Sequence, residues 1–308
     1  MDTRRIGSLD VSAVGLGCNN FGTRLDYYAT ASVVEAALEA GITFFDTADI
    51  YGRGRSEEYL GSALGARRDR VVLASKFGME MGPGRHGGAP GYVRRAVEDS
   101  LRRLRTDHLD LCQLHRPDPD TPIARTLEAL DGLVRAGKVR EIGCSAFTAA
   151  QLAEARTAAG PGAKFASVQN EYSLLHREPE REVLAECGRQ GMAFLPYYPL
   201  ASGVLTGKHR PGASPPRNTR LAVHPDWARR FLTERNLATA AALERLAAEQ
   251  GRTLLDLAVS WLLGRAAVAS VIAGASSPAQ VRANAAAGGW RIAPDVLARI
   301  DTLTGESP

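Results

Sequence analysis

The stretch ITFFDTADIYGRGRSE, residues 42–57, changes from an apolar run to a polar loop within a few positions. The run at 42–47 has the length and the aromatic content of a buried β-strand, and its apolar part ends at Asp46. Asp49 and Tyr51 follow in a glycine-containing loop. A strand that ends at an acid is common, but an acid and a phenol together at its carboxyl end indicate a functional site.

Similar apolar runs alternate with helical patterns along most of the chain. The eight predicted strands lie at 12–17, 42–47, 70–76, 109–115, 139–145, 166–170, 192–198 and 269–275. Amphipathic stretches at 29–41, 91–107 and 122–138 predict helices, and glycines such as Gly41 and Gly137 are typical helix stops. Strands that alternate with helices of this length form parallel βαβ units. Eight such units favour a (β/α)8 barrel, with a doubly wound open sheet as the alternative.

Two segments add to this α/β pattern. RRIGSLDVSAVG, residues 4–15, predicts a short N-terminal hairpin because GSLD is a turn between two extended stretches. Residues 199–268 separate the last two strands and contain a Pro/Gly/Ser-rich loop at 209–220 before two helical patterns, which predicts an elaborated loop before the last strand. Barrels commonly use roughly 250 to 300 residues as one domain, so we expect a single domain over 1–308.

The composition disfavours several classes of protein. The chain is 44% hydrophobic and 23% charged, as is ordinary for a soluble globular protein. It has no apolar run of about 18 residues and no signal-like N-terminus, so we expect a cytoplasmic protein without a membrane partner. The formal charge is only +4 and the short arginine clusters lack interleaved aromatics, which argues against nucleic acid. The four widely spaced cysteines indicate reduced thiols.

Four chemically distinct residues end or follow three successive predicted strands. Asp46 and Tyr51 follow the second run, Lys76 ends the third and His115 ends the fourth. Each has an ordinary alternative: Asp46 could cap a turn, Tyr51 could pack, Lys76 could extend to the surface and His115 could lie at the rim. Active sites of parallel barrels lie at the carboxyl ends of the strands, so we expect the four to converge there. We call them the tetrad.

Proton transfer is the chemistry that suits the tetrad. A tyrosine titrates near pH 10, about three units too high for an acid at neutral pH, unless a cation such as Lys76 stabilises its phenolate. Asp46 can compensate the charge of Lys76, and His115, as imidazole or imidazolium, can donate to a carbonyl oxygen. None of these side chains is a reductant, so the electron pair must come from elsewhere, and a hydride from a nicotinamide cofactor would supply it.

At this point the chain resembles the aldo-keto reductases, over nearly its whole length. The similar segments are DTADIYGRGRSEEYLGSAL, VVLASKFG, LDLCQLHRPDPDTPIARTLEALDGLVRAGKVREIGCSAF, VQNEYSLLHR, YYPLASGVLTGK and VIAGASSPAQVRANAAA. The resemblance implies a (β/α)8 barrel and an NAD(P)H-dependent reduction of an aldehyde or ketone, or the reverse oxidation. It also implies that the catalytic residues are Asp46, Tyr51, Lys76 and His115.

The resemblance further implies a set of cofactor contacts. Ser145 and Gln169 would hold the nicotinamide carboxamide, and Tyr197 would stack on the ring. The remaining contacts would be Leu200, Gly203, Leu205 and Lys208 at the pyrophosphate, and Gly274, Ser276, Gln280 and Asn284 at the adenosine end. Two departures from the family pattern stand out: Ala146 replaces the usual Asn, and the basic residue often used against the 2′-phosphate is absent. We expect NADP(H) rather than NAD(H).

Other interpretations remain open at this stage. GPGRHG at 82–87 matches a dinucleotide fingerprint, but it lies six residues beyond a strand and does not open a helix, so a substrate loop is a better account. A metal-dependent hydrolase is disfavoured because the six histidines form no H-x-H pair, and no metal is expected. A non-enzymatic cofactor-binding regulatory subunit is a further alternative. The substrate, a small carbonyl compound or alcohol, would contact Asn19, Phe21 and Trp227; the sequence indicates no oligomeric state.

Overall fold

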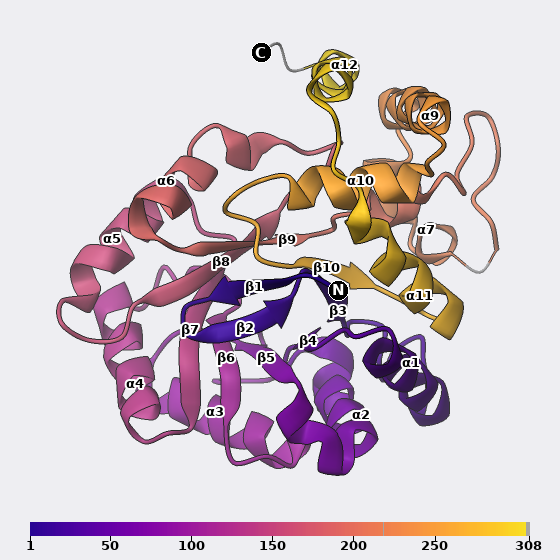
Figure 1. Ribbon diagram of the computed structural model, residues 1–308. Helices are drawn as coiled ribbons and strands as arrows, with labels where there is room; N and C mark the ends of the chain where they lie inside the picture. Colours follow the sequence, from indigo (N-terminus) through magenta and orange to yellow (C-terminus); the bar gives the residue numbers. More distant parts are fainter. Residues whose placement is uncertain (218, 306–308) are drawn as a thin grey trace.

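Eight parallel strands form the centre of the computed structural model, which describes residues 1–217 and 219–305 (Figure 1). The spatial order is β10-β3-β4-β5-β6-β7-β8-β9, so neighbours in the sheet are neighbours in sequence except where β10 meets β3. Their bounds are β3 Val14–Gly17, β4 Phe44–Asp46, β5 Val72–Phe77, β6 Leu109–Leu114, β7 Val139–Ser145, β8 Phe165–Glu171, β9 Ala193–Tyr197 and β10 Val271–Gly274. Each corresponds to one predicted run.

The two outer strands of this sheet, β9 and β10, approach each other and close the barrel. The amide of Phe194 donates to Ala267 O at 2.7 Å, and the amide of Ala269 donates to Phe194 O at 3.0 Å. A parallel bridge links Phe194 and Val268. The predicted (β/α)8 barrel is therefore confirmed, and the open-sheet alternative is wrong.

Helices surround the barrel, as Figure 1 shows. Several begin at a polar cap: Asp26 accepts from the amide of Ala29, and Thr148 and Thr253 form capping boxes. Among the described residues the helices are α1 Tyr27–Glu39, α2 Arg55–Leu64, α3 Pro90–Leu104, α4 Ile123–Arg135, α5 Ala149–Ala159, α6 Val183–Gln190, α7 Arg220–Val223, α8 Pro225–Phe231, α9 Glu234–Glu249, α10 Leu254–Leu263, α11 Pro278–Ala286 and α12 Pro294–Thr304. Short 3₁₀ turns lie at η1 Tyr51–Gly54, η2 Gly65–Arg70, η3 Glu178–Glu180, η4 Ala201–Thr206 and η5 Ala287–Gly289.

The predicted N-terminal hairpin covers one end of the barrel. Strands β1, Thr3–Ile6, and β2, Leu9–Ser12, pair antiparallel around the turn at Gly7 and Ser8. The side chains of Ile6, Leu9 and Val11 are buried in one hydrophobic cluster with barrel residues that include Phe44. Burial of this kind contributes roughly 1.5–3 kcal/mol per large apolar side chain. Because the hairpin closes this end, the opposite, carboxyl end is left for a site. Ser12, predicted as the start of the first barrel strand, belongs to the hairpin.

The segment between β9 and β10 is more helical than the sequence predicted. Two long helices, α9 and α10, were expected there, but the short helices α7 and α8 precede them. Proline at 225 is the first residue of α8, a position that needs no intrahelical amide donor. Single residues such as Pro225 therefore decide where these short helices begin, and such residues do not produce a long amphipathic pattern in the sequence.

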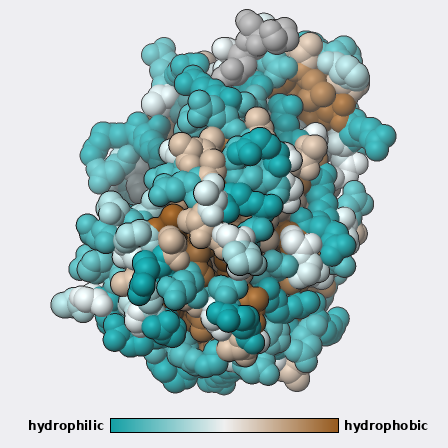
Figure 2. All heavy atoms as spheres, turned by 90° about the vertical axis from the view of Figure 1, so that its left-hand side faces the viewer, coloured by the Kyte–Doolittle hydropathy of each residue, from teal (hydrophilic) through white to brown (hydrophobic). Residues whose placement is uncertain are grey.

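The surface that carries α4, α5 and α6 is mostly hydrophilic, with hydrophobic residues in small groups (Figure 2). No helix in the described part of the chain has the length and apolar content that crossing a membrane requires.

Candidate active site

The tetrad converges at the carboxyl ends of three adjacent strands. Asp46 ends β4, Lys76 lies near the end of β5, and His115 directly follows β6. Tyr51 begins η1, the 3₁₀ turn that follows β4. The parallel register pairs Asp46 with Ala74 and Lys76 with Gln113, so Lys76 leaves β5 two positions beyond the residue opposite Asp46. The structure therefore brings together all four residues that the sequence singled out.

A buried ion pair holds the cation of the site. Lys76 Nζ donates to Asp46 Oδ2 at 2.5 Å and to Thr47 O at 3.0 Å, and both side chains are nearly inaccessible to solvent. Burial alone would lower the pKa of Lys76, but Asp46 and Tyr51 raise it, and the net pKa lies above its ordinary value. Lys76 is therefore charged throughout the neutral range.

Tyr51 lies between this cation and the histidine. Lys76 Nζ is 5.3 Å from the centroid of the Tyr51 ring, and the rings of Tyr51 and His115 meet edge to face at 5.9 Å. Burial raises the pKa of Tyr51, Lys76 lowers it and Asp46 raises it, so the net pKa is above the ordinary value. Lys76 lowers the pKa of Tyr51, as predicted, but the effect of burial is larger. The phenol is therefore protonated at neutral pH.

His115 is a neutral imidazole. Burial lowers its pKa to about 3, and the charges of Lys76 and Arg116 act in the same direction. Its Nδ1 is buried and has no hydrogen-bond partner among the described residues. Of the two protonation states that the sequence left open, the structure favours imidazole over imidazolium. His115 can still donate one N–H in a hydrogen bond to a substrate oxygen, but as a neutral imidazole it cannot act as the general acid.

Two glutamines position Asp46, and the sequence analysis missed one of them. Asp46 Oδ1 accepts from Gln113 Nε2 at 3.1 Å and from Gln169 Nε2 at 3.0 Å. Gln113 lies in the middle of the apolar run LDLCQL, where its inward direction is visible only once the barrel closes. With Lys76 on its other oxygen, Asp46 has both carboxylate oxygens hydrogen-bonded, which fixes its orientation.

The residues expected at the nicotinamide carboxamide lie beside this network. Ser145 Oγ donates to Gln169 O at 2.8 Å, so the two are adjacent at the ends of β7 and β8. Ala146, which follows Ser145, adopts a φ of 60°. Asn is several-fold enriched in this left-handed region, so the backbone keeps the conformation suited to the family's usual residue while the amide group is absent.

The segment after β9 places backbone and cation where the pyrophosphate is expected. Ala201, Ser202 and Gly203 have φ values of 45°, 54° and 98°. A Cβ on Gly203 would lie 2.6 Å from Lys208 Nζ, so only glycine allows the lysine to fold over the turn. Turns that mix right- and left-handed residues are known anion-binding concavities. The side chain of Leu205 is fully buried, so any ligand contact there involves its backbone.

Two arginines join Lys208, and the sequence did not identify them. Burial lowers the pKa of Lys208, and the charges of Arg24 and Arg220 lower it further, which places three cations close together. Arg220 Nη2 donates at 2.9 Å to Asn19 Oδ1 and also at 2.9 Å to Asn20 Oδ1. This contact spans 201 positions in sequence and brings the start of α7 close to the segment that follows β3. Such a cationic group suits a ligand with several negative charges.

Buried polar atoms without hydrogen-bond partners lie at or next to several of the expected cofactor contacts. Among the described residues they include Ser202 Oγ and both ring nitrogens of His209 near the cations, and Nδ2 of Asn284 on α11. Buried polar groups in folded proteins nearly always have partners, so these atoms are candidates for contact with a ligand. Ser276 and Gln280, expected at the adenosine end with Gly274, hydrogen-bond each other: the Ser276 amide donates to Gln280 Oε1 at 2.8 Å. These residues fit an extended dinucleotide.

The predicted substrate residues divide into two kinds. Trp227 is half-buried and packs against Tyr198, with ring centroids 5.4 Å apart. Ionisation of Tyr51 would raise the pKa of both Tyr197 and Tyr198, so both lie near the tetrad. Asn19 is also at the rim, but its side-chain oxygen is occupied by Arg220. The prediction for Phe21 is wrong, because its side chain is completely buried in the main hydrophobic core.

The glycine-rich segment 82–87 has no role in phosphate binding by the Rossmann mechanism. It folds on itself, with the Arg85 amide donating to Gly82 O at 2.9 Å and the Gly87 amide donating to Gly78 O at 2.9 Å. Helix α3 begins only at Pro90. The fingerprint requires the helix to open directly from the glycine turn, so the match is coincidental.

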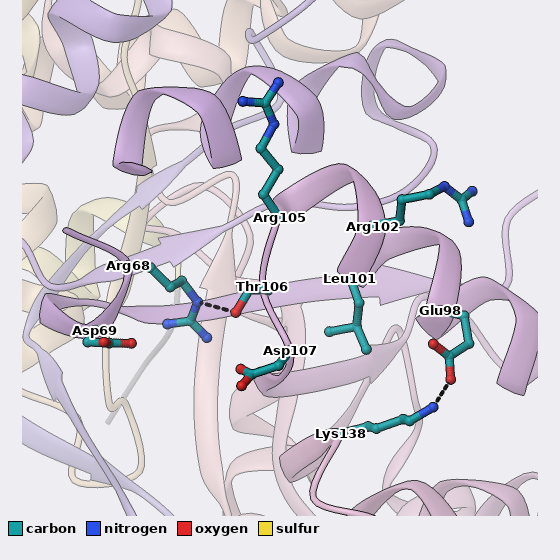
Figure 3. Close-up of a pocket in the computed structure, with 9 residues that line it drawn as sticks. All are labelled: Arg68, Asp69, Glu98, Leu101, Arg102, Arg105, Thr106, Asp107 and Lys138. Carbon is teal, nitrogen blue, oxygen red and sulfur yellow. Dashed lines mark hydrogen bonds and ion pairs between the residues drawn. The ribbon is translucent and has the colours of Figure 1, made fainter. Parts of the chain in front are cut away.

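A hollow of about 800 Å³ lies elsewhere, among residues that precede strands β5, β6 and β7 (Figure 3). These residues belong to the amino-terminal end of the barrel, opposite the tetrad. Its charged side chains are largely paired: Lys138 with Glu98, and Arg68 with Thr106 and Asp110. Active sites of such barrels lie at the other end, so we assign this hollow no catalytic role.

The fold and the tetrad define a (β/α)8-barrel protein with its site at the carboxyl rim. The model of the aldo/keto reductase family matches residues 13–304. A probable voltage-gated potassium channel subunit beta of Arabidopsis thaliana is 35% identical over 90% of this chain and 87% of its own length. The aldo-keto reductase YhdN of Bacillus subtilis is 33% identical over 96% of this chain and 90% of its own. A solved glycerol dehydrogenase of Gluconobacter oxydans superposes with a TM-score of 0.85 at 30% identity, over 98% of this chain and 94% of that one.

The chain therefore belongs to the aldo/keto reductase family, as the resemblance predicted. It is an oxidoreductase that acts on carbonyl groups with a nicotinamide cofactor. The family assignment favours this function over the alternative of a metal-dependent hydrolase. The described residues contain no group of three or more His, Cys, Asp or Glu side chains that could hold a metal ion.

Proposed function

We propose that the protein reduces an aldehyde or ketone to an alcohol with NADPH, or catalyses the reverse, and that Tyr51 is the proton donor. The observation that carries this proposal is the position of a protonated phenol between a charged lysine and a neutral imidazole at the barrel rim. When bound, the reduced nicotinamide supplies the hydride. In this proposal side chains of this chain supply the proton donor, the cation that stabilises its phenolate and the hydrogen bond that orients the carbonyl group.

In this mechanism Tyr51 transfers its proton to the substrate oxygen as negative charge develops there. Lys76, 5.3 Å from the Tyr51 ring, stabilises the phenolate that remains, and Asp46 keeps the lysine in place. Neutral His115 donates an N–H to the same substrate oxygen and orients the carbonyl group. In the oxidative direction the phenolate takes the proton back.

A regulatory subunit without turnover is the alternative, since one group of relatives is named as potassium channel beta subunits. The complete tetrad in this chain favours an enzyme. Turnover of a generic aldehyde, followed by the absorbance of the reduced cofactor, distinguishes the two: a binding subunit would bind the cofactor and leave the absorbance unchanged.

Cofactor binding can be tested directly by the fluorescence of the chain. Trp227 lies near the tetrad and within 5.3 Å of Arg220, so NADPH should quench its emission at micromolar concentrations. The variant Trp227→Phe should bind with similar affinity but show a smaller change, because Trp227 is the tryptophan that packs against Arg220 and Tyr198. Absence of any response at millimolar NADPH and NADH would refute the proposal.

We expect a modest preference for NADPH over NADH. Neutral contacts from Ser276 and Gln280 would hold the 2′-phosphate, and charge-assisted hydrogen bonds are about twice as strong as neutral ones. A higher kcat/KM with NADH would contradict this. Lys208→Gln and Arg220→Gln serve as controls: they should weaken both cofactors alike and leave the ratio unchanged, because the pyrophosphate is common to both.

A further inference from the structure

Asp49 lies between Asp46 and Tyr51 in sequence, but its carboxyl group faces helices α2 and α3 instead of the tetrad. Its side chain is 2% exposed. Its Oδ2 accepts a long hydrogen bond, 3.5 Å, from the hydroxyl of Tyr92 on α3. Its Oδ1 is buried and has no partner among the described residues. An ionised carboxylate would be poorly satisfied here, since charged oxygens normally accept several hydrogen bonds.

A second buried carboxyl lies beside it and takes the available cation. Glu57 on α2 is completely buried, and it accepts from Ser75 Oγ at 2.5 Å and from Arg103 Nε at 2.6 Å. The guanidinium of Arg103 is therefore already engaged. Two carboxyl groups share one cation, and a pair of this kind retains a proton more readily than an isolated acid.

The titratable groups around Asp49 come from three elements. They are Glu57 on α2, Tyr92 and Arg103 on α3, and Cys112 on β6, while Arg85 acts on Tyr92. Burial, and next the negative charge of Glu57, raise the pKa of Asp49 to about 7, although the Ile50 amide, Arg103 and Tyr92 act in the opposite direction. Burial, then Asp49 and Glu57, raise the pKa of the Cys112 thiol, which stays neutral.

The backbone at Asp49 fixes the segment that carries Tyr51. The Asp49 amide donates to Lys76 O at 3.0 Å, which ties the loop to β5. The Tyr51 amide donates to Ala48 O at 3.1 Å, which closes a turn from Ala48 to Tyr51. Inside the barrel, Lys76 links this segment to Asp46, because its Nζ donates to both Asp46 Oδ2 and Thr47 O. Outside the barrel, the side chain of Asp49 connects the same segment to Tyr92 on α3.

We infer that Asp49 is a positioning residue whose protonated carboxyl keeps the 47–51 segment against β5, and that loss of this proton loosens the segment and displaces Tyr51. The inference rests on the proposed function, in which Tyr51 donates the proton. An unpaired charge buried between α2, α3 and β6 is costly, and movement of the loop toward water is the simplest relief.

The test is the pH profile of kcat for the wild type and for Asp49→Asn, which resembles the protonated acid. With a pKa of about 7, only about a tenth of the wild-type protein keeps this proton at pH 8. Wild-type kcat should therefore fall about tenfold between pH 6 and pH 8, and Asp49→Asn should stay nearly level. Glu58→Gln removes an exposed carboxyl group from α2, the helix that carries Glu57, and its pH profile should match that of the wild type.

Hydrogen exchange tests the positioning without reference to activity. After correction for intrinsic rates, amides 47–51 of the wild type should exchange faster at pH 8 than at pH 6, and those of Asp49→Asn should not. Tyr92→Phe is a second variant, which removes a hydrogen bond that lowers the pKa of Asp49. The fall in kcat and the rise in amide exchange should therefore both occur at a higher pH than in the wild type. Identical pH profiles and identical exchange for wild type and Asp49→Asn would overturn the inference. Absence of turnover at every pH would refute the proposed function alone, because the exchange result still decides the role of Asp49.

Discussion

Tyr51→Phe is expected to lower the rate of carbonyl reduction by about 10² to 10⁴, the usual contribution of general acid catalysis. The substitution keeps the ring, and with it the edge-to-face contact to His115 at 5.9 Å, but deletes the proton that we assign to the substrate oxygen. Cofactor affinity should change little, because the hydroxyl is assigned to the substrate and not to the cofactor. Single-turnover kinetics with NADPH and a generic aldehyde would measure the chemical step.

The structure also predicts how this loss depends on pH. Since burial lowers the pKa of His115 to about 3, the imidazole has no proton to supply in place of the phenol at pH 5 to 8. The rate loss of Tyr51→Phe should therefore be nearly the same from pH 5 to pH 6, where Asp49 keeps its proton, and a recovery at acidic pH is not expected. Tyr59→Phe makes the same change on α2, where Tyr59 packs against Tyr27, and should leave the rate unaltered. If Tyr51→Phe retained more than about a tenth of wild-type kcat, the assigned mechanism would be wrong.

Lys76→Met should reduce both the rate and the stability of the fold. The charge of Lys76 lowers the pKa of Tyr51, so its loss leaves a weaker acid, and reduction should slow to a degree similar to Tyr51→Phe. Asp46 would at the same time remain buried with only Gln113 and Gln169 as partners. Removing one member of a buried ion pair typically costs about 3–5 kcal/mol, which denaturant unfolding can measure.

The double variant Asp46→Asn/Lys76→Met separates these two effects. It removes the uncompensated carboxylate, so most of the lost stability should return, whereas the rate should stay low because no cation is restored. A double variant that recovered activity along with stability would show that Lys76 acts only through the fold.

Local patterns in the sequence determined the barrel and the identity of the tetrad. Eight apolar runs alternating with helical stretches predicted the strands that the structure contains, because side-chain periodicity and helix stops act within a few residues. In a parallel barrel, a polar residue that ends a strand must lie at the carboxyl rim, so topology alone placed Asp46, Lys76 and His115 close together.

The tertiary structure decided which way each polar group faces and what charge it carries. Asp46 and Asp49 are three positions apart and look equivalent in sequence, yet one pairs with Lys76 inside the barrel and the other meets Glu57 and Tyr92 outside it. Arg220 reaches Asn19 across 201 positions, which no local pattern encodes. The net rise in the pKa of Tyr51 likewise depends on desolvation, a property of the whole surrounding fold, which outweighs the single charge of Lys76.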